Sequence, residues 1–233
     1  MGGGVSPYLR EDFSTYTSTA NMIADPRNIY SNSEEFNTNY IVLDTGVGYG
    51  ALTQSMRYDW PATGSAPGIT ISRQLDFPSN QTEVWIEFAV RFSSNFSIDA
   101  NYAGGKAYKL FHANIASGGP AGRFGMQFEN GDAGTLNGEG PNDDYQNLYF
   151  TTSTSSSSLW DQSWHVIRWH ISLGATDTHQ IWVDGVSQGS ATGSTAATGI
   201  NGLAIGKNMN QGPLQTQEIW WGYVDVYTQN PGW

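Results

Sequence analysis

Apolar and polar residues alternate in short runs along almost the whole chain, and this pattern limits the possible folds more than any other feature. In the clearest run, "TEVWIEFAVRF" (82–92), Val84 and Ile86 share one face while Trp85 and Glu87 share the other. A period of two residues is that of a β-strand with one buried face. We therefore expect strands at 39–44, 52–60, 68–75, 82–92, 106–113, 123–129, 146–152, 164–173, 179–185, 201–207 and 218–228.

Helices are expected to be few, because no stretch has a convincing helical period; short ones are expected near 31–37 or 159–163. Charged residues are only 13% of the chain, and small polar residues and glycine are abundant, which favours strands joined by turns. Loops are expected at 62–68, 130–144 and 189–199. The chain is therefore expected to be an all-β sandwich or barrel with one domain, residues 1–38 packing on a body formed by residues 39–233.

The charge balance excludes two classes of partner. The 21 acidic residues outnumber the 10 basic ones, which gives a net charge of −11, and the basic residues form no cluster. Nucleic acids and anionic membrane surfaces both need a basic face, so neither is expected as a partner. There are no cysteines, which excludes disulfides and thiolate metal sites. No apolar segment has the length of a signal peptide core or a membrane span.

The outer faces of several expected strands carry large aromatic, amide and charged residues instead of small polar ones. Sugar rings stack their apolar faces on aromatic rings, and their hydroxyls pair with carboxylates, amides and guanidinium groups. These faces therefore favour carbohydrate binding, although the tryptophans could instead lie under loops or in a subunit contact. The candidate ligand-binding residues are Trp85, Glu87, Arg91, Gln127, Glu129, Arg168, His170 and Trp182.

Four segments in the second half resemble the closing half of concanavalin A-like lectin/glucanase jelly rolls, the superfamily that includes laminin-G-like domains. They are "WHVIRWHISL", "HQIWVDGV", "AIGKN" and "WWGYVDVYTQNPG". The upstream run from residue 82 also resembles the central strands, so the resemblance spans roughly 40–230. It implies a two-sheet antiparallel jelly-roll β-sandwich that holds its ligand on a concave face. The fold hosts lectins, hydrolases, lyases and virion proteins, so it implies little about function.

A glucanase-type hydrolase is one enzyme that the resemblance allows. Such enzymes carry Glu-x-Asp-x-(x)-Glu on one strand, whereas this chain has Trp85 at the middle position, between Glu83 and Glu87. Two carboxylates four residues apart on a strand lie ~13 Å from each other. Glycosidases need ~5–5.5 Å or ~6.5–9.5 Å. The remaining pair is Glu87 with Glu129 from another strand.

A polysaccharide lyase is the other enzyme that the resemblance allows. "GGKAYKLFHAN" (104–114) resembles the lysine-bearing strand of some lyases, which adds Lys109 to the candidate ligand-binding residues. Such enzymes remove a proton beside a uronate carboxylate and neutralise that carboxylate. The candidate catalysts are Lys109, His112, Arg168 and His170. Against a lyase, the sharper motifs of alginate lyases are missing, and the acidic chain would repel a polyuronate unless the groove is locally basic.

Neither carbohydrate binding nor the two enzyme activities require a cofactor, but the resemblance implies a structural calcium ion near the chain ends. Asp225 matches the aspartate of the family's final strand, and Asp25 or Asp44 could join it. Calcium takes oxygen ligands of this kind.

The expected function is a non-catalytic, lectin-like carbohydrate-binding or surface-display module, such as a capsid decoration or fibre protein of a phage or virus. Its partners would be carbohydrate or other virion or surface proteins, including further copies of itself. Its place would be a virion surface or, by a non-standard route, the cell exterior, and otherwise the cytoplasm. The alternatives are a polysaccharide lyase acting by β-elimination on a uronate polymer and, second, a glycoside hydrolase.

Overall fold

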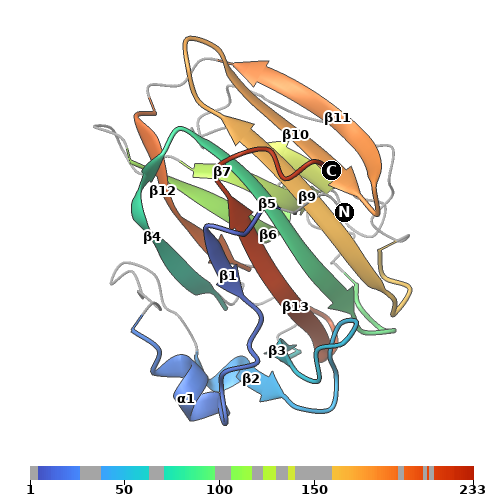
Figure 1. Ribbon diagram of the computed structural model, residues 1–233. Coiled ribbons are helices and arrows are strands. Elements are labelled where there is room, and N and C mark those ends of the chain that lie inside the picture. The colour runs from blue at the N-terminus through green and yellow to red at the C-terminus, as the bar shows by residue number, and fades with distance from the viewer. Residues whose placement is uncertain are drawn as a thin grey trace.

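Two β-sheets pack face to face in the computed structural model, which describes residues 5–26, 38–62, 71–97, 106–116, 123–129, 136–139, 159–193, 197–206, 209 and 213–233 (Figure 1). The elements are β1 (Leu9–Glu11), α1 (Thr19–Ile23), a 3₁₀ turn (Thr38–Tyr40), β2 (Ile41–Asp44), β3 (Ser55–Trp60), β4 (Arg73–Gln81), β5 (Glu83–Phe92), β6 (Lys106–Ala116), β7 (Arg123–Glu129), β8 (Leu136–Glu139), β9 (Trp164–Ser172), β10 (Asp177–Val183), β11 (Val186–Gly193), β12 (Gly199–Ile205) and β13 (Gln217–Tyr227).

The larger sheet, called sheet A, has eight strands in the order β11-β10-β9-β5-β13-β3-β2, with β1 also paired to β13. The smaller sheet, called sheet B, has five strands in the order β4-β12-β6-β7-β8. Every pairing among the described strands is antiparallel. This confirms the predicted all-β, two-sheet antiparallel jelly-roll sandwich.

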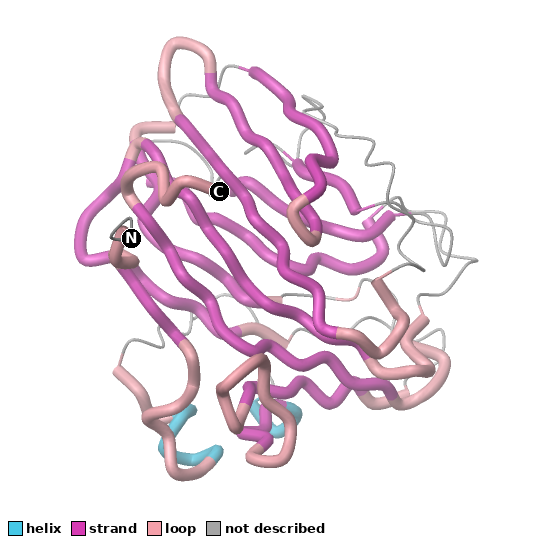
Figure 2. Tube along the Cα trace, turned by 45° about the vertical axis from the view of Figure 1, so that its right-hand side comes forward, coloured by secondary structure: helices cyan, strands magenta, loops and turns pink. Residues whose placement is uncertain are grey.

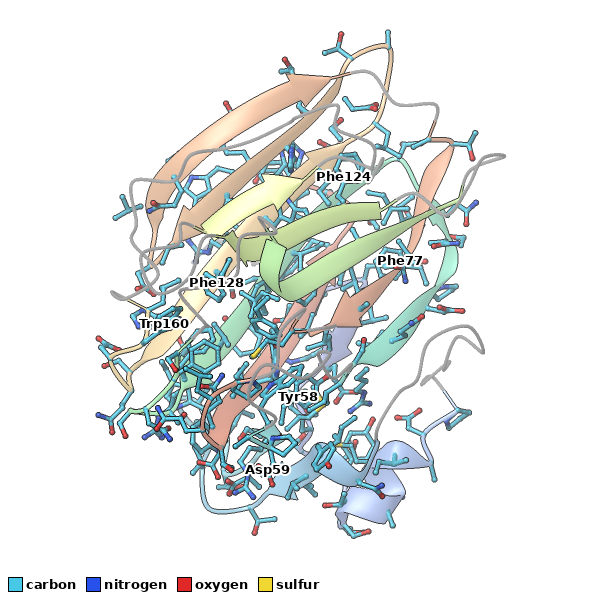
Figure 3. All side chains as sticks on the ribbon, turned by 180° about the vertical axis from the view of Figure 1, so that it is seen from behind. Tyr58, Asp59, Phe77, Phe124, Phe128 and Trp160 are labelled. Atoms are coloured by element: carbon cyan, nitrogen blue, oxygen red, sulfur yellow. The ribbon has the colours of Figure 1, made fainter. Side chains whose placement is uncertain are left out.

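Aromatic side chains from both sheets fill the space between them. Phe88 of sheet A stacks on Phe111 of sheet B with ring centroids 4.6 Å apart, and Trp221 packs beside both. Figure 3, seen from the sheet B side, labels Phe124 and Phe128 of β7, which are both fully buried. Each such side chain contributes about 1.5–3 kcal/mol on burial. The core therefore separates the outer faces of the two sheets from each other.

The predicted alternation holds along β5 and β9 of sheet A, whereas the central strand β13 is buried along almost its whole length. On β5 the even-numbered residues from Val84 to Phe92 are buried, and on β9 the odd-numbered residues from His165 to Ile171 are buried. The opposite residues, such as Trp85 and Arg168, lie on the outer face.

Other predictions about the elements were incomplete. The strands β1, β8 and β11 and the helix α1 were not predicted; β8 lies within the loop expected at 130–144, and β11 overlaps the loop expected at 189–199. The strand expected at 68–75 begins at Arg73 and runs to Gln81. No helix forms at 159–163, while the stretches 31–37 and 146–152 lie outside the described residues. Within the described residues, no helix is long and apolar enough to cross a membrane.

The N-terminal segment is joined to both sheets. Its strand β1 pairs with β13 of sheet A, and Phe13, Tyr16 and Met22 belong to the main hydrophobic core. Glu11 binds Arg73 of sheet B at 2.7 Å, and both side chains are only 2% exposed. Residues 9–25 are therefore part of the folded body and not a loosely attached arm.

Candidate functional site

The structure divides the predicted ligand-binding residues between the outer faces of two sheets, with the core between them. Trp85, Glu87, Arg91, Arg168, His170 and Trp182 belong to sheet A, whereas Lys109, His112, Gln127 and Glu129 belong to sheet B. The four candidate lyase residues are therefore not brought together, and neither are Glu87 and Glu129. Two separate surfaces take the place of the single surface that was expected.

On sheet A, the candidate charges bind one another. Cross-strand register places Arg168 beside Glu87, and Glu87 beside Asp225. Arg168 Nε donates to Glu87 Oε2 at 2.6 Å, and the Tyr223 hydroxyl donates to Glu87 Oε1 at 2.7 Å. Both carboxylate oxygens of Glu87 are thus in use, and this pair forms a structural network on the outer face.

The other arginines of this face also have partners. Arg57 binds Asp44 and Asp59, Arg10 lies 3.3 Å from Asp12 and 3.6 Å from Asp225, and Arg91 lies over the ring of Trp220. Among the described arginines of sheet A, Arg91 alone lacks a carboxylate partner, so this sheet has little unpaired positive charge to attract a polyanion.

Asp225 lies at the centre of this network and is only 4% exposed. Its Oδ1 atom has no hydrogen-bond partner among the described residues. Burial raises the pKa of Asp225 to about 6; the Arg10 guanidinium opposes this shift and the Glu87 carboxylate adds to it. The folded protein therefore holds the proton of this carboxyl more tightly than the unfolded chain does.

The substitution Asp225→Asn is expected to make the protein more stable at neutral pH. The stability that protonated Asp225 contributes is fully present below about pH 4 and is lost as the pH rises through about 6. Asparagine removes that loss, so the free energy of unfolding should rise by about 2–3 kcal/mol at neutral pH and depend less on pH between those values. Urea denaturation of both proteins across this range is the measurement. If the free energy of unfolding depends on pH in the same way in both proteins, the prediction is wrong.

The expected calcium ligands do not fit a cation. Asp225 faces Arg10, Asp44 binds Arg57, and Asp25 lies 3.8 Å from the Arg73 guanidinium while accepting a hydrogen bond from Tyr16. A bound calcium ion needs several oxygen ligands without a competing cation among them. Within the described residues, no three histidine, aspartate or glutamate side chains gather as a metal site. No step of a mechanism is therefore assigned to a metal.

On sheet B, the central strand β6 contains a bulge beside Lys109. Lys109 is the register partner of Gln127 on β7, but the next pair along is Phe111 with Met126. Leu110 therefore has no register partner on β7. Bulges of this kind redirect side chains and occur often beside active sites.

The bulge changes which residues of β6 share a face. Leu110 and Phe111 are adjacent and both fully buried, and Ala113 is buried as well. Positions 109 and 112 therefore both fall on the outer side, although strict alternation would separate them. The backbone register therefore assigns these two sequence positions to the same side of β6.

Two further polar residues occupy neighbouring register positions. Gln127 lies between the buried residues Met126 and Phe128, and its partner on β8 is Asn137. The row Lys109, Gln127 and Asn137 thus crosses three adjacent strands. Asn137 was not predicted from the sequence, because the four residues of β8 are too few to show an alternation of apolar and polar residues.

Comparison with known proteins shows the same architecture in several polysaccharide lyases. No protein-family model matches the chain, and no curated protein sequence matches it significantly. The alginate lyase Aly36B is similar with a TM-score of 0.64 and 16% identity, over 96% of this chain and 98% of that one. A variant of Aly36B with a lysine and a tyrosine replaced by alanine forms a complex with alginate tetrasaccharide.

Two other lyases are similar to a comparable extent. The endo-β-1,4-glucuronan lyase of the fungus Trichoderma reesei gives a TM-score of 0.61 at 14% identity, over 88% of this chain and 92% of that one. The PL-14 alginate lyase of Aplysia kurodai gives 0.61 at 14% identity, over 97% and 100%. At this identity the likeness shows the fold alone, a two-sheet jelly-roll sandwich.

Proposed function

We propose that the chain is a polysaccharide lyase that cleaves a uronate polymer by β-elimination on the outer face of sheet B. The observation that supports this proposal is the β6 bulge, from which we infer that Lys109 and His112 share one face, at register positions next to Gln127. The lyases among the structural neighbours support it. The comparisons give no support to the lectin-like or virion role that the sequence alone favoured.

The reaction needs a base and a group that neutralises the substrate carboxylate. The base takes the proton from C5 of the uronate, the bond from C4 to the bridging oxygen breaks, and a C4–C5 double bond forms. The bridging oxygen leaves with a proton supplied by an acid or by water. Histidine and lysine are suited to the proton transfer. The amides of Gln127 and Asn137 are suited to hydrogen-bond the carboxylate.

The distribution of charge also favours sheet B. On its central strand, Lys109 has the uncharged Gln127 as its register partner on β7, although Lys106 has Glu129. Three of the four sheet A arginines, Arg10, Arg57 and Arg168, instead lie against carboxylates. A uronate polymer is a polyanion, so it is attracted to a locally cationic strand on an otherwise acidic protein.

A panel of alginate, glucuronan and glycosaminoglycans tests the proposal. The protein should release products with the ultraviolet absorbance of the new double bond from at least one of these polymers. Lys109→Ala should lower the rate by about 10²-fold or more. The matched control is His170→Ala on sheet A, which should leave the rate almost unchanged.

Each rival function gives a different result. A hydrolase would release reducing ends without the double bond, and a lectin would bind polymer without releasing product. A rate that falls with His170→Ala and not with Lys109→Ala would place the chemistry on sheet A and overturn the assignment.

A further inference from the structure

The C-terminal segment 228–233 crosses the outer face of sheet A, on the side of the molecule away from sheet B (Figures 1 and 2). Its last residue, Trp233, packs against two tryptophans of that sheet. The Trp233 ring centroid lies 5.3 Å from Trp85 and 5.4 Å from Trp182, with its plane at 75° to each. The guanidinium of Arg168 lies 5.0 Å from the Trp233 ring centroid.

Trp85 and Trp182 form a pair of nearly parallel rings, which we call the indole slot. Their planes differ by 24° and their centroids are 6.5 Å apart. The ring of His170 stacks on Trp85 at 3.7 Å and is held by Glu83 at 2.8 Å. The slot is therefore fixed by side chains of three adjacent strands, while the ring that closes it comes from the C-terminal segment.

Pro231 and Trp233 are the half-buried residues of the C-terminal segment, and the ring contacts with sheet A come from Trp233. In the described part of the chain, no hydrogen bond joins residues 228–233 to the sheet, and the one they make, from Gly232 N to Asn230 Oδ1, is internal. Residues 228–230 and Gly232 are exposed. A competing ligand therefore has to displace the ring contacts of Trp233 and the packing of Pro231, but no hydrogen bond to the sheet.

The chemistry around the slot suits an uncharged sugar chain. Indole rings stack on the apolar faces of sugar rings. Glu83, whose side chain is 46% exposed, and the half-buried Gln180 lie on β5 and β10, the two strands that flank β9, and can pair with hydroxyls. A polyuronate does not suit this face, because its arginines are bound to carboxylates or stacked on rings.

We propose that the indole slot is a second carbohydrate-binding site, specific for an uncharged glycan, and that Trp233, which stands edge-on to both indoles, covers it. The site lies on the opposite sheet from the proposed lyase site and does not depend on it. It gives the protein a means to attach to a neutral polysaccharide while sheet B acts on a uronate polymer. Because segment and glycan compete, the apparent affinity is reduced by the fraction of molecules in which the slot is closed.

Affinity electrophoresis in gels containing hydroxyethylcellulose, xylan or mixed-linkage β-glucan tests this, with alginate as the charged comparison. Trp233→Ala should open the slot and bind at least one neutral polymer about fivefold or more tighter than the unchanged protein. Adding Trp182→Ala to that variant should weaken binding about tenfold. Leu214→Ala, at an exposed apolar residue away from the slot, is the matched control and should change nothing.

Two results would overturn the proposal: equal retention of Trp233→Ala and the unchanged protein by every neutral polymer, or full retention of the Trp182→Ala, Trp233→Ala double variant. Thermal melts of each variant establish that the sandwich is folded during the measurement. Lys109→Ala should keep its neutral-glycan binding, and Trp182→Ala should keep its rate on a soluble uronate polymer. The two proposals can therefore fail independently.

Discussion

Replacing Glu11 by alanine is expected to lower the free energy of unfolding by about 3–5 kcal/mol, because it leaves a charged arginine buried without its main partner. Glu11 and Arg73 are each 2% exposed and 2.7 Å apart. Glu11 also accepts hydrogen bonds from Phe13 N and from the Tyr16 hydroxyl. Asp25, at 3.8 Å from the guanidinium, offsets only part of the loss. Equilibrium denaturation in urea measures the change.

Two matched variants show whether the lost partner is the cause. Glu218→Ala removes a carboxylate that is 38% exposed and 3.7 Å from Arg57, and it should cost no more than about 1 kcal/mol. Glu11→Met combined with Arg73→Met removes both charges and should recover much of the stability. Recovery is expected because Nε and Nη1 of Arg73 have no hydrogen-bond partner among the described residues. A double variant as unstable as Glu11→Ala would mean that packing, and not charge, explains the loss.

Trp221→Ala is expected to cost about 3–5 kcal/mol, because it removes a fully buried ring between the sheets. The indole packs against Tyr58, Phe88 and Phe111, with centroids 6.1, 5.6 and 6.2 Å away. Thermal and urea denaturation measure the effect, with the exposed Leu214→Ala as a control that should stay within about 0.5 kcal/mol. Equal losses of unfolding free energy in the two variants would show that burial of the Trp221 ring does not stabilise the core.

The alternation of residues predicted the fold class and the buried faces of β5 and β9, but not which strands share a sheet. Trp85 and Gln127 both follow the rule of facing away from the core, yet they lie on opposite sides of the molecule. Alternation is a local property of one strand, whereas sheet membership depends on pairings between strands far apart in sequence. The sequence therefore predicted most of the candidate residues but placed them on one surface instead of two.

The bulge on β6 also could not be predicted from the sequence. Lys109 and His112 are three residues apart, so a regular strand would place them on opposite faces. Nothing in "KAYKLFHAN" marks Leu110 as the unpaired residue, because Leu110 and Phe111 are both apolar. Similarly, the second part of β11, residues 189–193, was predicted to be loop because "GSATG" consists of residues common in turns. Pairing with β10 makes this segment a strand.

The position of β13 has a consequence for how this protein is made. This last strand in the sequence lies in the middle of sheet A, between β5 and β3, and it also pairs with β1. During synthesis, β5 and β3 leave the ribosome long before the strand that joins them. Until then their edges are unpaired and open to association with other chains. Sheet A can thus close only after synthesis reaches residue 227, and we expect holdase chaperones to raise the yield of folded protein.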